Sequence, residues 1–163
     1  MSELKTRLVN ILKAEKELYQ KLFQAAQAKN EALLNNDIDQ LLEEVEIDKK
    51  IIPLIEEKEL ERTKTIAEIK KAFKIEEEKD SYSALLKELP ADWSAELNPL
   101  REELLSLTEE FNSLNKQNQL LLKQALELNQ LSLQSILNNL EDQTTYSRPT
   151  AEQNQPRILN QQG

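Results

Sequence analysis

The sequence predicts an all-α fold: an elongated antiparallel bundle of three long helices, with a short helix in the second connection and a disordered C-terminal tail. Apolar residues recur along most of the chain at spacings of three and four, the period of a helix that buries one face. The 163 residues include a single Gly and five Pro. Because strands need turns and turns usually need Gly, the chain is expected to be nearly all helix with few, short connections.

The first two long helices are expected over residues 3–34 and 38–75, joined by the tight turn Asn35-Asn36-Asp37. Asn tolerates the left-handed conformation that ends a helix, and Asp37 can cap the helix that follows. Such a short turn makes the two helices antiparallel neighbours. Pro53 lies inside the second helix, where it predicts a kink rather than a break, because the apolar spacing continues across it.

Three charged residues fall on the apolar lines of these helices. Glu15 is expected to reach solvent at the edge of the first helix. Glu59 and Arg62 make the centre of the second helix polar, and a charge pair there could fix the register of the helices. We expect both residues to be partly exposed, and an exposed pair contributes only about 0–1 kcal/mol to stability.

The second connection holds a short helix over residues 82–89, which Pro90 ends. The third long helix then begins at Asp92 or at Pro99, and the sequence leaves both starts open. Trp93 is expected to anchor this connection to the end of the bundle. The predicted organisation is a helical bundle over 1–141.

A polar tail follows over residues 142–163, with two prolines and no hydrophobic period. Such a segment buries too little surface to order itself. Tyr146 and the pair Ile158-Leu159 are its apolar islands, and islands of this kind often dock on partners.

Composition excludes several classes of function. A net charge of −9 disfavours nucleic acid and anionic lipid, and no apolar run reaches the length of a membrane span. With neither His nor Cys, most nucleophilic and general-base constellations cannot be built. A carboxylate-only metal site or a glycosidase-like carboxylate pair is possible in principle, but the Asp and Glu residues fall on solvent faces of helices, mixed with Lys, so we expect no enzyme activity and no cofactor. The N-terminus has no secretory signal pattern, and the absence of Cys fits a cytoplasmic protein.

The stretch from Pro99 to Leu140 carries more apolar surface than one packing face needs. One line runs along the helix through Phe111 and Leu114 to Leu121 and Leu128, and a second appears from Leu122 onward. At about 100° per residue the second line lies roughly 100–150° away from the first. We expect the first line to pack within the bundle and the second to bind a protein partner. The residues expected to bind this partner are those of the second line together with Leu121 and Leu128 at the end of the first: Leu121, Leu122, Leu126, Leu128, Leu133, Ile136, Leu137 and Leu140.

Asn118 occupies a position on the packing line of the third helix. A buried Asn at such a position costs stability and specifies which register the helices adopt. We therefore interpret Asn118 as a register-setting residue rather than as a ligand.

Four motifs make the chain similar to the FlgN family of flagellar type III export chaperones. They are Leu60-Glu61-Arg62, the connection YSALLKELP (82–90), the segment FNSLNKQNQLLLKQALEL (111–128) and the TTY motif ending at Tyr146. Each motif alone is unspecific, but their order and spacing over nearly the whole chain resemble the family.

This resemblance implies a cytoplasmic chaperone that binds the helical C-terminal segments of hook–filament junction proteins, prevents their premature assembly and delivers them to the export gate. It implies that residues 120–140 bind the client and that Tyr146 contacts the gate. The alternative is a structural coiled-coil scaffold or tether without a client, and a homodimer of the free protein stays open. The scaffold reading predicts apolar stripes of even width along all helices.

Overall fold

A computed structural model describes residues 2–76 and 82–139, with the backbone alone for residues 82, 83, 132, 133 and 135–139. Four helices make up these ranges and no strand occurs in them, which confirms the all-α prediction. The helices are α1 (Ser2–Asn35), α2 (Ile38–Ala72), α3 (Tyr82–Glu88) and α4 (Ala91–Asn139).

Two left-handed residues end the first two helices in a chain with a single Gly. Asn36 has a φ of 54°, as expected, and the Asp37 carboxylate accepts a 3.1 Å hydrogen bond from the Gln40 backbone N–H. Lys74 also has a φ of 54° and follows the end of α2. The Ile75 N–H donates a 2.9 Å bond back to the Lys70 carbonyl, a pattern that closes a helix C-terminus. Helix α2 therefore ends three residues before the predicted Ile75.

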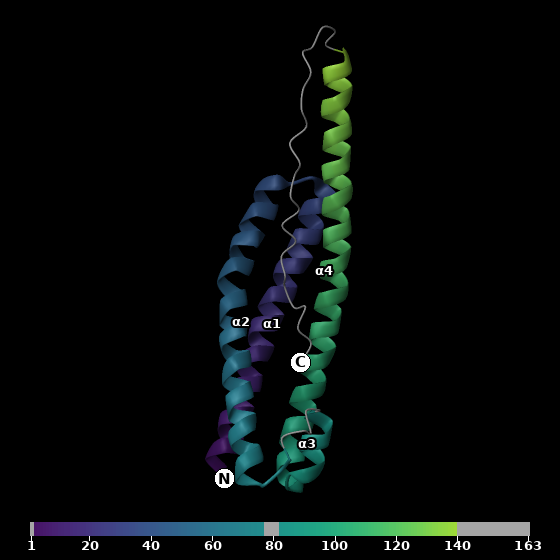
Figure 1. Cartoon of the computed structure of the whole chain (residues 1–163). Coiled ribbons are helices and arrows are strands. Elements are labelled where there is room, and N and C mark those ends of the chain that lie inside the picture. The colour runs from purple at the N-terminus through teal and green to yellow at the C-terminus, as the bar shows by residue number, and fades with distance from the viewer. Residues whose placement is uncertain (1, 77–81, 140–163) are drawn as a thin grey trace.

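The contacts between α1 and α2 show that the two helices are antiparallel. As the α1 partner moves from Arg7 to Lys29, the α2 partner moves back from Glu68 to Asp48. Figure 1 shows the same arrangement, with α1 rising from the N-terminus to the turn and α2 returning beside it. The packed interface is lined by aliphatic side chains: Leu8, Leu12, Leu22, Ala26, Ile51, Ile55 and Ile69 are all buried.

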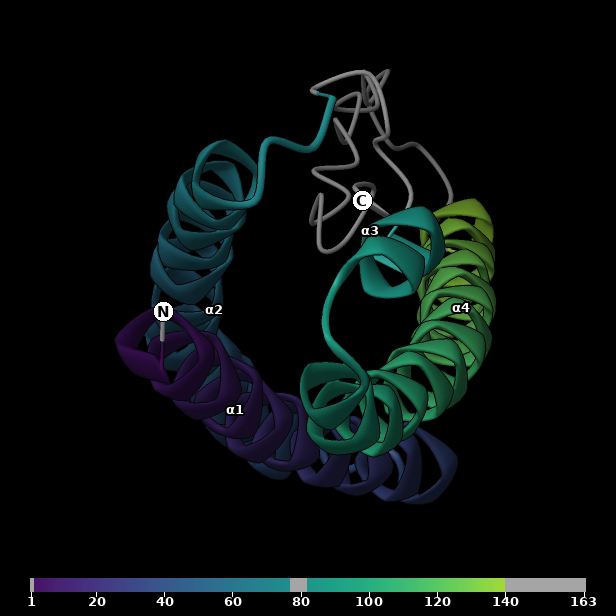
Figure 2. The same ribbon diagram turned by 90° about the horizontal axis from the view of Figure 1, so that it is seen from below.

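Helix α4 lies on another side of α1 and runs parallel to it. Lys5 pairs with Asp92 and Glu96, while Asn30 contacts Asn118 much further along both helices. Helix α1 therefore packs against both α2 and α4, and α2 and α4 have no comparable packing against each other over the described residues. Seen along the helices, the three form an open curve with α1 at its middle (Figure 2).

Neither internal proline ends a helix. Pro53 lies inside α2, which is continuous through it, and Pro99 lies inside α4. Helix α4 begins at Ala91, one residue before the earlier of the two predicted starts. Trp93 in its first turn is buried and packs edge-on against Phe73, with ring centroids 5.1 Å apart. The indole thus ties the start of α4 to the end of α2, where the sequence predicted an anchor.

Candidate partner-binding surface

Helix α4 extends well beyond the α1–α2 turn (Figure 1). The side-chain contact between Asn30 and Asn118 joins residues 88 positions apart. With this offset, the end of α1 at Asn35 is level with about Lys123, and α4 continues for about 16 more residues to Asn139. At 1.5 Å per residue this is about 24 Å of helix with no α1 beside it. We call residues 120–139 the α4 extension.

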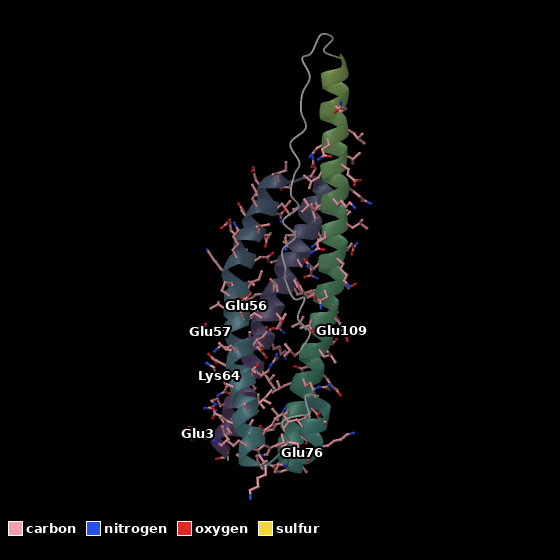
Figure 3. All side chains as sticks on the ribbon, viewed as in Figure 1. Glu3, Glu56, Glu57, Lys64, Glu76 and Glu109 are labelled. Atoms are coloured by element: carbon pink, nitrogen blue, oxygen red, sulfur yellow. The ribbon has the colours of Figure 1, made fainter. Side chains whose placement is uncertain are left out.

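The described side chains of the α4 extension are largely apolar and exposed. Leu122 is 41% exposed and Leu126 is 48% exposed. Leu120, Leu128 and Leu131 are exposed as well. Charged side chains such as Glu56, Glu57 and Lys64 cover the outer part of α2 instead (Figure 3). Ile47, Leu54 and Leu60 of α2 are exposed as well, so the extension is distinguished by its position and by how closely its exposed leucines follow one another.

Leu122 and Leu126 continue the face of α4 that packs on α1. Phe111 and Asn118 are buried on that face, and positions seven and eleven residues after Phe111 point in nearly the same direction. The prediction that the Leu122 line lies on a separate face, 100–150° away, is therefore wrong. This line is exposed because α1 ends beside it. The apolar spacing within α4 does not reveal where a neighbouring helix ends, so the sequence could not show this.

The remaining predicted partner-binding residues divide into two groups. Leu128 is exposed and Leu121 is half-buried to one side of the packing face. The side chains of Leu133, Ile136 and Leu137 lie outside the described ones, and Leu140 and Tyr146 lie outside the described residues altogether.

Sequence reasoning missed an apolar group on the α1–α2 turn. Leu34, Ile38 and Leu42 are exposed there, at the level where the α4 extension begins. Ile38, the first residue of α2, is 59% exposed. The signal that could have found the group is the concentration of large apolar residues around a turn.

Asn118 lies at the boundary between the packed part of α4 and the extension. It is 5% exposed, and its side-chain N–H donates a 2.8 Å bond to the Ala26 carbonyl. Its side-chain oxygen accepts a 3.0 Å bond from the Asn30 amide. These polar contacts fit only one alignment of α1 and α4, so they support the interpretation of Asn118 as a register-setting residue.

Two ion pairs are buried between α1 and α2. Glu15 was expected to reach solvent, and this expectation is wrong: its side chain has no exposed surface and accepts a 3.1 Å bond from Arg62. Burial raises the pKa of the Glu15 carboxyl to about 7, and the Arg62 guanidinium opposes part of that rise. Arg62 and Glu59 are partly exposed, as predicted.

Glu59 accepts a 3.1 Å bond from the Tyr19 hydroxyl. Burial, reinforced by the Glu59 carboxylate, raises the pKa of Tyr19. The second buried pair joins Lys29 to Asp48, and burial raises the pKa of Asp48 against the opposing hydrogen bond from Lys29. These groups link α1 to α2 through their side chains.

An open hollow of about 730 Å³ lies between α1 and α4, next to the Asn30–Asn118 contact. Phe23 and Leu114 line it together with amides and the carboxylates of Glu109 and Glu110. No group of His, Cys, Asp or Glu suited to hold a metal ion occurs among residues 2–76 and 82–139. No helix within these same ranges is both long enough and apolar enough to span a bilayer.

Comparison with known proteins gave one match. The family described as "FlgN protein" matches residues 1–154, almost the whole chain. No curated protein and no solved structure matches it significantly. The match covers all four helices and the α4 extension.

Proposed function

The chain belongs to the FlgN family, and we propose that it binds the helical C-terminal segments of hook–filament junction proteins in the cytoplasm. Family membership implies the role of a flagellar export chaperone in general, and the family's members are chaperones rather than enzymes. The choice of client, the protection of that client from premature assembly and its delivery to the export gate are our proposal.

The exposure of Leu122 and Leu126 carries this proposal. Both residues continue a face that buries apolar side chains wherever α1 covers it. A client helix with its own apolar face removes the two leucines from water. Burial of a leucine contributes about 1.5–3 kcal/mol, so the pair supplies about 3–6 kcal/mol before ordering costs. A contribution of this size suits a complex that has to form and later release its client.

A scaffold without a client is the competing proposal. It predicts apolar stripes of even width along all helices and a constitutive oligomer. The exposed leucines of α4 instead concentrate near one end, with Leu105 the exception in its packed part. This uneven distribution favours a local binding surface.

Binding measurements on variants test the client proposal. Leu122→Asp combined with Leu126→Asp is expected to weaken binding of a junction protein's C-terminal segment at least 100-fold by calorimetry. Leu105→Asp is the matched control, because Leu105 is 48% exposed on the part of α4 that lies beside α1. Its affinity should stay within twofold of wild type, and circular dichroism should show unchanged helix content in all variants.

Three outcomes contradict the proposal. If the wild-type protein does not bind the segment, the proposed client is wrong. If the protein forms a stable homo-oligomer whether or not the segment is present, the scaffold proposal is supported instead. Loss of helix content in the double variant would place Leu122 and Leu126 in the core.

Delivery to the gate is assigned by family resemblance to Tyr146, which lies outside the described residues. Tyr146→Ala should leave client affinity unchanged and reduce export of the client from cells. A fall in client affinity would instead assign Tyr146 to the client site.

A further inference from the structure

We propose that the binding site is a corner with two sides, in which the α1–α2 turn forms the floor and the α4 extension forms the wall. The occupant is an amphipathic client helix that stands on the floor, end to end with α1. This inference rests on the proposed function and adds a second binding element, together with the placement of the client.

The floor consists of Leu34, Ile38 and Leu42, which are 66%, 59% and 58% exposed. Leu34 belongs to the last turn of α1, and Ile38 begins α2. Leu42 follows Ile38 by one turn and therefore lies on the same side of α2. Three large apolar side chains at one turn form a local patch, whereas scattered exposed leucines carry no such meaning.

The register of α1 and α4 places the floor at the foot of the wall. Asn30 contacts Asn118, and four residues further along each parallel helix come Leu34 and Leu122. The two leucines are therefore level with each other. Leu34 lies one turn beyond Asn30 on the same side of α1, which is the side that contacts α4.

The wall specifies where the client helix lies. Below the turn, the face of α4 that includes Phe111 and Asn118 is covered by α1. Leu122 lies level with the last turn of α1 and Leu126 lies beyond it; both present the same face and are 41% and 48% exposed. A helix packed on them continues an established helix–helix interface, so its axis follows that of α1 and its end meets Leu34 and Ile38.

The dimensions and charge of the wall define the partner. About 24 Å of free α4 accommodates a helix of about four turns. Lys123 and Glu127 are the two charges of the wall, one of each sign, and residues 128–139 carry none. The partner is therefore recognised mainly by apolar residues at spacings of three and four and by neutral polar groups at their flanks. The apolar stripe of such a helix packs against the wall, and an apolar residue at its end packs against the floor.

Floor variants test the inference with the full chain and the junction protein's C-terminal segment as probe. Leu34→Asp and Leu42→Asp should each weaken binding at least tenfold. Leu60→Asp is the matched control, because Leu60 is 57% exposed on α2 outside the floor, and its affinity should stay within twofold of wild type. If the floor variants bind like wild type while Leu122→Asp with Leu126→Asp does not, the client lies on α4 alone and only this inference fails.

The absence of Cys permits a second test by single labels. An environment-sensitive fluorophore on Leu34→Cys should shift to shorter wavelength when the segment is added, whereas the same fluorophore on Leu60→Cys should not. If the emission of the Leu34→Cys label moves to shorter wavelength as the protein concentration is raised, with no segment present, the floor binds a second copy of the chain. A concentration-independent shift that disappears with Ile158→Asp and Leu159→Asp would assign it to the chain's own tail. Either result would overturn the client as occupant.

Discussion

Glu15 of α1 has no exposed surface and accepts a 3.1 Å hydrogen bond from Nη1 of Arg62 on α2. Only one carboxylate oxygen is satisfied: Oε1 of Glu15 has no hydrogen-bond partner among the described residues. A buried carboxylate with one hydrogen-bonded cation depends strongly on that cation, here Arg62, whereas Lys58 acts on Glu15 through its charge alone and more weakly. Arg62 also belongs to one of the motifs that carry the family resemblance, and its position here is structural.

Removal of Arg62 should therefore destabilise the protein severely. Arg62→Ala leaves the Glu15 charge buried and unpaired, which costs about 3–5 kcal/mol of unfolding free energy near pH 8. Urea denaturation followed by circular dichroism measures this loss. Lys58→Ala is the control, since Lys58 pairs with the partly exposed Glu61, and its cost should stay below about 1 kcal/mol. Similar costs for both variants would show that the buried pair has no special weight.

The stability of the protein should fall as pH rises from about 4.5 to 7. The pKa of Glu15 is about 7 in the folded protein, whereas an unperturbed glutamate carboxyl has a pKa of about 4.5. Between these values the folded state binds more protons than the unfolded state, so raising the pH favours unfolding. Asp48, whose pKa is also raised, acts in the same direction.

Glu15→Gln isolates the part due to Glu15, because glutamine does not titrate. The wild type should lose stability relative to this variant as pH rises through the same interval, as measured by urea titrations at several pH values. A stability difference that is constant with pH would contradict the assignment of this titration to Glu15.

The Lys29–Asp48 pair allows a direct comparison of buried and exposed ion pairs on α2. Both side chains are at most 10% exposed, so Lys29→Ala should cost about 3–5 kcal/mol by leaving Asp48 unpaired. Lys49 pairs with Glu46 nearby, and both are about two-thirds exposed, at 66% and 65%. Lys49→Ala should therefore cost at most about 0.5 kcal/mol. Thermal and urea unfolding check both values, and a reversed order would be incompatible with the packing of α1 on α2.

Asn118 should control the register of α1 and α4 more than their stability. Asn118→Leu removes the bonds to Ala26 and Asn30 and should leave the melting temperature unchanged or raised, because leucine suits a buried position. Spin labels on Lys13→Cys and Glu102→Cys should give one narrow distance in wild type. In the variant a shift of one turn moves α4 by about 5 Å along its axis relative to α1, so a second population should appear in the distance distribution.

Asn112→Leu serves as the control, since Asn112 is half-buried on the same helix. This substitution should keep the single narrow distance. An unchanged distance distribution for Asn118→Leu would show that other contacts determine the register.

Periodicity and capping residues were sufficient to predict the helical elements. The apolar spacing outweighs the local effect of Pro53, and Asn36 and Asp37 carry the turn chemistry that the structure shows. These features depend on residues close together in the chain. The sequence left two starts open for the last helix, and the structure has it beginning at Ala91, with Pro99 inside the helix and Trp93 of its first turn packed on Phe73.

Contacts between distant segments explain the incorrect predictions. Glu15 seemed exposed because its partner, Arg62, lies 47 residues further on in another helix. The face of Leu122 was misassigned because its exposure depends on where α1 ends relative to α4. Spacing within one helix gives the direction of a side chain, but not whether another helix reaches it.

The length of free α4 is the difference between two helix lengths, counted from the common level near Lys5 and Asp92. Shortening the α1–α2 hairpin by two turns at its closed end would uncover two more turns of α4 without touching any residue of that helix. Changes in the hairpin would then alter how long a segment the protein can hold, so selection for clients of different size can act without any substitution in α4.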